Sequence, residues 1–80
     1  MESGIRTLEG EVTIQFGRDD EGGSIYEMEV SGMRFSIEAP LYESLSDGDS
    51  LKVRCASSHN PLDPDERRLI SVHRHVKKRD

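Results

Sequence analysis

The chain has 80 residues, of which 32% are hydrophobic and 34% are charged. A chain of this length forms one domain and buries only about 60–65% of the surface that its unfolded form exposes. Its single cysteine, Cys55, excludes an internal disulfide and favours a reducing compartment, so we expect a cytoplasmic protein or a cytoplasmic-side domain of a larger one. Residues 1–6 lack a secretory signal pattern, and no apolar run approaches the roughly 20 residues of a membrane helix.

The formal net charge of −5 is unevenly distributed along the chain. Residues 1–49 carry 12 acidic and 3 basic side chains, whereas residues 50–80 carry 4 acidic and 8 basic ones. This asymmetry indicates either a polarised surface with an end that meets a partner, or a solvated surface with a basic C-terminal tail.

Alternating apolar and polar residues predict three strands in the first half of the chain. Residues 7–16 place Leu8, Gly10, Val12, Ile14 and Phe16 on one face. After a polar loop at 17–23, residues 26–30 and 33–37 form the clearest hairpin, joined by Ser31 and Gly32. Glycine at the second position of such a connection supplies the positive φ that a tight turn needs.

A short helix and two further strands are predicted in the second half. Residues 39–47 read as a helix of about two turns, with Pro40 at its first position and Gly48 as its stop. Residues 49–56 form a fourth strand with Leu51, Val53 and Cys55 facing inward, and 57–68 form a long polar loop. In the fifth strand, at 69–76, the same parity puts Ile70, Val72, Arg74 and Val76 inward and Ser71, His73 and His75 outward.

These elements predict an all-β fold in which five strands form an OB-like Greek-key barrel, with one short helix between the third and fourth strands. We expect a flexible N-terminus at 1–6, the barrel at 7–76 and a basic tail at 77–80. The predicted core consists of Val12, Ile14, Met28, Val30, Phe35, Ile37, Leu51, Val53, Ile70 and Val72.

Four short segments resemble known small barrels: residues 10–12, the hairpin with Gly32, residues 45–53 and residues 68–72. They are similar to the small OB domains of the bacterial initiation-factor-one type and to OB-like modules of bacterial membrane-associated proteins. The resemblance spans 7–76 and implies a fold much more than a function, because such barrel motifs are common to many activities.

OB-folds typically bind ligands across the outer face of the second and third strands. Single-stranded nucleic acid would need aromatic rings and basic side chains there. The sequence offers mostly carboxylates, and Phe16, Tyr26 and Phe35 fall on the inward parity. We therefore expect a non-catalytic module that binds another protein or a domain of its parent chain, through Ile25, Glu27, Glu29, Arg34, Ser36 and Glu38.

The alternative is a domain that binds single-stranded RNA or DNA through a basic side formed by the fourth and fifth strands. Its candidate residues are Lys52, Arg54, Arg67, Arg68, Arg74, Lys77 and Lys78. The bland interpretation is that these are solvated charges, partly offset by the acidic residues of the loop at 57–68.

No catalytic or cofactor motif stands out, so we expect neither an enzyme nor a bound cofactor. His73 and His75 are two residues apart and could supply two zinc ligands, but a zinc site needs three or four. Cys55 has inward parity, which fits a small buried hydrophobe better than a nucleophile. We therefore expect no metal site.

Overall fold

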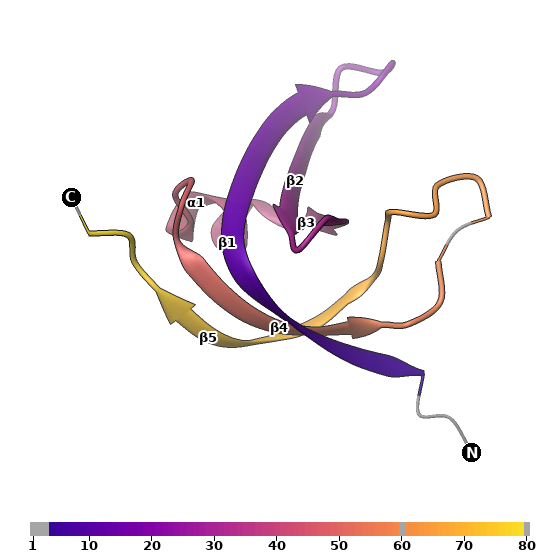
Figure 1. Cartoon of the computed structure of the whole chain (residues 1–80). Coiled ribbons are helices and arrows are strands. Elements are labelled where there is room, and N and C mark those ends of the chain that lie inside the picture. The colour runs from indigo at the N-terminus through magenta and orange to yellow at the C-terminus, as the bar shows by residue number, and fades with distance from the viewer. Residues whose placement is uncertain (1–3, 60, 80) are drawn as a thin grey trace.

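The computed structural model describes residues 4–59 and 61–79 as one five-stranded antiparallel sheet with a short helix (Figure 1). The sheet has the order β3-β2-β1-β4-β5. The all-β class and the element order are therefore as predicted. The elements are β1 (Ile5–Arg18), β2 (Ser24–Val30), β3 (Met33–Ile37), α1 (Ala39–Ser44), β4 (Ser50–Ala56) and β5 (Leu69–Val76).

The long first strand belongs to both halves of the sheet. Residues 5–11 of β1 pair with β4, and residues 12–18 pair with β2. Figure 1 shows that β1 is strongly curved, so that one half pairs with β4 and the other half pairs with β2. The strand begins two residues before the predicted start, and Arg6 pairs with Cys55. Residues 1–3 of the predicted flexible N-terminus lie outside the described residues.

The tight hairpin between β2 and β3 is confirmed. Its two loop residues, Ser31 and Gly32, have φ values of 53° and 82°. Two successive positive φ values give the turn whose twist matches that of paired strands. The Ser31 hydroxyl donates to the carbonyl of Glu9 at 2.9 Å. It lies 3.1 Å from where a Cβ on Gly10 would be, so a glycine at position 10 lets the hairpin approach β1.

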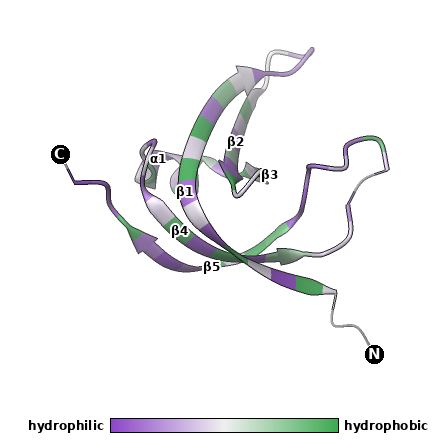
Figure 2. Cartoon of the chain, viewed as in Figure 1, coloured by the Kyte–Doolittle hydropathy of each residue, from purple (hydrophilic) through white to green (hydrophobic). Residues whose placement is uncertain are grey.

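The core lies where the inward faces of both half-sheets meet. Figure 2 shows hydrophobic and hydrophilic bands alternating along β1, as a half-buried strand requires. Ile14, Ile37 and Val72 are partly buried against this core. The fully or almost fully buried apolar side chains are Val12, Met28, Val30, Phe35, Leu45, Leu51, Val53, Cys55 and Ala56.

The predicted inward face of the fifth strand is wrong in part. Register shifts occur between Lys52 and Val53 and again between Arg54 and Cys55, so β5 changes phase against β4. Such bulges turn a strand's side chains from one face to the other. Val72 packs against the core as expected, but Ile70 and Val76 are 42% and 46% exposed. Arg74 has the inward parity but is exposed, as its place in the predicted basic side requires.

The helix is shorter than predicted. It ends at Ser44, and Leu45 is extended with φ −103° and ψ 153°. Pro40 lies in its first turn as expected. Gly48, predicted as the helix stop, instead has φ 92° in the turn that leads into β4. The early end lets Leu45 leave the helix and enter the core.

The predicted closed barrel is not found, because no ladder of hydrogen bonds joins the edge strands β3 and β5 among the described residues. Among the described residues, the edge of β3 meets the opposite side of the sheet through one parallel bridge, between Arg34 and Glu66. Two backbone hydrogen bonds support it: Arg34 N–H donates to Asp65 and Arg67 N–H donates to Arg34, at 2.8 and 2.9 Å. These residues precede β5, so the loop at 57–68 lines β3 without joining the sheet as a strand.

Phe35 has the largest fully buried side chain, so its truncation tests this core. Phe35→Ala should cost roughly 3–5 kcal/mol, near the whole stability of so small a domain. Phe16→Ala is the matched control and should cost much less, because Phe16 is 47% exposed. Urea unfolding followed by circular dichroism measures both. A Phe35→Ala protein that unfolds like the parent would contradict the described core.

Candidate binding surfaces

The acidic face predicted on the second and third strands is formed by the hairpin register. Glu27 lies opposite Ser36, and Glu29 lies opposite Arg34, so the four side chains share one side of the sheet. Glu29, Ser36 and Glu38 are exposed, whereas Ile25, Glu27 and Arg34 are half-buried. We call these six residues the acidic face. The strand register brings together four of the six, whereas Ile25 pairs with β1 and Glu38 is the N-cap of α1.

Arg34, the one base of the acidic face, is neutralised by the loop at 57–68. Its guanidinium donates to both carboxylate oxygens of Asp63, at 2.6 and 2.5 Å. This hydrogen bond, together with the Asp63 charge, raises the pKa of Arg34 further above its ordinary value. The ion pair is partly buried, and its carboxylate partner was not foreseen from the sequence. Because Asp63 pairs with Arg34, the six residues of the acidic face include three glutamates and no unpaired cation.

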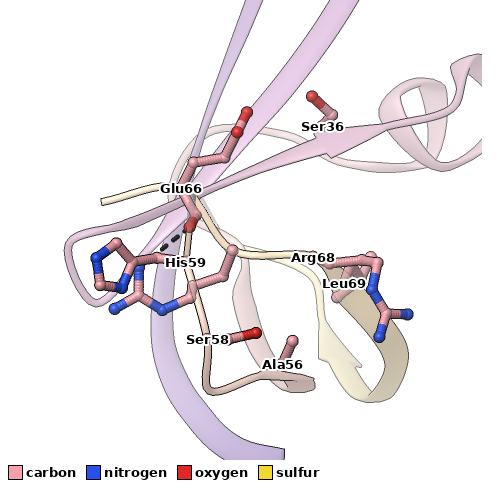
Figure 3. Close-up of a pocket in the computed structure, with 8 residues that line it drawn as sticks. Ser36, Ala56, Ser58, His59, Glu66, Arg68 and Leu69 are labelled. Carbon is pink, nitrogen blue, oxygen red and sulfur yellow. Dashed lines mark hydrogen bonds between the residues drawn. The ribbon is translucent and has the colours of Figure 1, made fainter. Parts of the chain in front are cut away.

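A pocket of about 430 Å³ opens beside this loop, between β3 and the end of β4. Figure 3 shows His59 and Arg68 on opposite sides of it, with Glu66 above. The guanidinium of Arg67 is held by the carbonyls of Pro64 and Glu66. Its Nε is buried and has no hydrogen-bond partner among the described residues. The lining is Ser36, Ala56, Ser58, His59, Glu66, Arg67, Arg68 and Leu69, a mixture of both charges rather than a basic site.

The seven basic residues of the alternative site do not form one patch. Lys52 and Arg74 are directly opposite each other on β4 and β5, and Arg54 follows on β4. Arg67 and Arg68 instead line the pocket described above, and Lys77 and Lys78 lie beside Asp49. The structure thus divides this predicted set into three groups. Of these, only Lys52, Arg54 and Arg74 lie side by side on paired strands.

Asp49 organises the C-terminal residues, a role that the sequence did not predict. Its side chain is completely buried, and His75 Nε2 lies 2.8 Å from Oδ2. The backbone N–H groups of Ser46 and Lys78 donate to its two oxygens at 3.0 and 2.9 Å. Lys77 donates from its ammonium group to the carbonyl of Ser44 at 2.6 Å. The start of the basic tail is therefore tied to the turn between α1 and β4.

The pKa of Asp49 is lowered to about 2, first by the hydrogen bond from His75 and then by the backbone donor of Lys78. An aspartate in an unfolded chain titrates near 3.9. The unfolded state therefore takes up this proton first as the pH falls. The stability that Asp49 contributes is present above about pH 4 and is lost as the pH falls toward 2.

We expect Asp49→Asn to be less stable than the parent near pH 6, because it removes the charge that His75 and Lys77 face. The difference in unfolding free energy between parent and variant should shrink steadily between pH 5 and pH 2. Denaturant unfolding at several pH values measures it, with Asp20→Asn at an exposed position as the control. A difference that stays constant over this range would contradict the described network.

Three aromatic rings lie on the surface where α1 meets β1 and β2, which the sequence did not lead us to expect. Phe16 has the predicted inward parity, yet it is 47% exposed because β1 continues past the core. Tyr26 and Tyr42 contact it and each other, with ring centroids 4.8–6.4 Å apart. We call Phe16, Tyr26 and Tyr42 the aromatic patch. The predicted strand already ended at Phe16, and that terminal position could have suggested that the ring lies beyond the core.

Catalytic and metal-binding candidates are not brought together. Burial raises the pKa of the Cys55 thiol, which suits a packed side chain rather than a nucleophile. His75 turns toward Asp49, whereas His73 is exposed. Within residues 4–59 and 61–79, no group of three His, Cys, Asp or Glu side chains could hold a metal ion. Over the same residues, the structure has no helix with the length and apolar character to cross a bilayer.

Comparisons with protein-family models, with curated proteins and with solved structures found no match.

Proposed function

We propose that this chain is a non-catalytic binding module whose acidic face contacts a basic surface of another protein or of a neighbouring domain. The observation that carries the proposal is the ion pair between Arg34 and Asp63. Because Asp63 neutralises the one base of the face, Glu27, Glu29 and Glu38 present uncompensated negative charge. Such a surface repels phosphates and attracts Lys and Arg, which favours a basic protein partner.

An OB-like barrel is the finer fold that we propose. The strand order β3-β2-β1-β4-β5 and the parallel bridge between Arg34 and Glu66 support it, because they bring the two sheet edges toward each other. In that architecture the outer face of the second and third strands is the usual place for a ligand. The acidic face occupies this place, which is an argument by fold analogy alone.

Binding of a short basic peptide tests the proposal. We expect a labelled peptide of alternating Lys and Ser to bind saturably at low salt and to weaken as salt is added. The double variant Glu27→Gln with Glu29→Gln should weaken this binding about tenfold by fluorescence anisotropy. The matched control is Glu9→Gln with Glu11→Gln, two exposed glutamates with the same spacing on β1. Equal losses from both pairs would contradict a specific acidic face.

The second candidate is single-stranded nucleic-acid binding on the outer side of β4 and β5. The cross-strand pair of Lys52 and Arg74 favours it, since two cations lie directly opposite each other. Residues 50–80 contain no Phe, Tyr or Trp, so no ring from these strands can stack on a base. Contact there would be electrostatic and sensitive to salt.

We expect no saturable binding of labelled single-stranded DNA or RNA at about 0.15 M salt, where screening acts over roughly 8 Å. Fluorescence anisotropy with oligonucleotides measures it. Micromolar or tighter binding that survives this salt, and that Lys52→Glu with Arg54→Glu abolishes, would place nucleic-acid binding first.

A further inference from the structure

The aromatic patch presents ring surface on the inner side of the hairpin formed by β1 and β2. Phe16 and Tyr26 are directly opposite in the register of the two strands, with centroids 5.4 Å apart. Tyr42 reaches them from α1 and lies 4.8 Å from Tyr26. Tyr26 and Tyr42 are half-buried, so they fix the patch, while Phe16 is the most exposed of the three. Rigid rings of this kind are enriched in protein-binding hot spots.

The patch already holds one guanidinium, from its own chain. The Cζ atom of Arg18 lies 5.6 Å from the centroid of the Phe16 ring. Its NH1 also donates to the carbonyl of Gly22 at 3.1 Å, so the loop after β1 keeps this side chain in place. A planar guanidinium stacks on an aromatic face and still donates hydrogen bonds at its edge, which an ammonium group cannot do as well. The neighbouring tyrosines offer further ring surface of the same kind.

Two of the segments that carry the rings are followed in the sequence by carboxylates. Asp19, Asp20 and Glu21 follow Arg18 in the exposed loop, and Glu43 follows Tyr42 on the exposed side of α1. Asp47 accepts the backbone N–H of Ile14, two residues before Phe16. Between Arg34 and Lys52 the sequence contains no Lys or Arg. The ammonium group of Lys77 donates to the carbonyl of Ser44, and the carboxylate of Asp49, 3.7 Å away, offsets its charge. The rings therefore lie in a predominantly negative surround.

We propose that the aromatic patch is a docking site for an arginine-bearing segment of a protein partner. A partner arginine would stack on the rings and pair with the flanking carboxylates, as Arg18 stacks on Phe16 within the chain. The inference rests on the proposed function, because it specifies which basic side chain the partner uses. It also assigns a second contact surface, since the patch and the acidic face lie on opposite sides of β2.

Two peptides of equal charge separate the roles of the two surfaces. One alternates Lys and Ser, as above, and the other replaces every Lys by Arg. The acidic face attracts both peptides alike, whereas the rings favour the guanidinium. We expect the Arg peptide to bind the parent protein more tightly in anisotropy titrations, by up to about fivefold, because Lys also contacts rings but the planar guanidinium stacks on them.

Variants at Phe16 locate this preference. Phe16→Leu keeps an apolar side chain but removes the ring, and it should bring the two peptides to equal affinity, whereas Phe16→Tyr should retain the difference. Circular dichroism verifies that both variants fold. Equal binding of the two peptides by the parent, or an Arg preference that survives Phe16→Leu, would overturn the aromatic docking site and leave the acidic face standing. Failure of both peptides to bind the parent would overturn the proposed function together with this inference.

Discussion

The structure depends on one strand that changes partners in its middle. Up to residue 11, β1 hydrogen-bonds with β4, and from Val12 onward it pairs with β2. At the changeover, Val12 also exchanges backbone hydrogen bonds with the turn before β4, donating to Asp49 and accepting from Gly48. Because no backbone group can be left unpaired in a core, these bonds fix where the two half-sheets separate. The turn that carries the buried Asp49 is held against β1 at that point.

The acidic face and the basic side of β4 and β5 differ in how their charges are arranged. On the acidic face, the loop at 57–68 supplies Asp63 to the one base, which leaves the glutamates unopposed. On β4 and β5, Lys52 has Arg74 as one cross-strand neighbour and Glu9 of β1 as the other, so an acidic side chain lies beside the cationic pair. Exposed opposite charges on adjacent strands offset one another, though each such pair contributes little to stability. Net charge along the chain is therefore a poor guide to the charge of any one face.

Alternation in the sequence was sufficient to predict the strands, the tight turn and most of the core, because side chains that alternate leave one possible buried face. It failed where the pairing itself is irregular: the two register shifts in β5 expose Ile70 and Val76, and no residue pattern marks them. Phe16 was misplaced for another reason, since parity gives the side of a strand but not whether any core lies there. The residues of the acidic face could be predicted, whereas the pairing of Arg34 with Asp63 joins residues 29 positions apart and depends on the path of the chain between them.

The buried carboxylate of Asp49 has a consequence for the order in which the strands assemble. Its partners include His75 and the backbone N–H of Lys78, which lie 26 and 29 positions further along the chain. Until β5 has docked, a chain whose other strands have formed holds a charged group without these donors, and burying such a group is unfavourable. Docking of β5 is thus coupled to the burial of Asp49, which makes folding a concerted event rather than a progressive one.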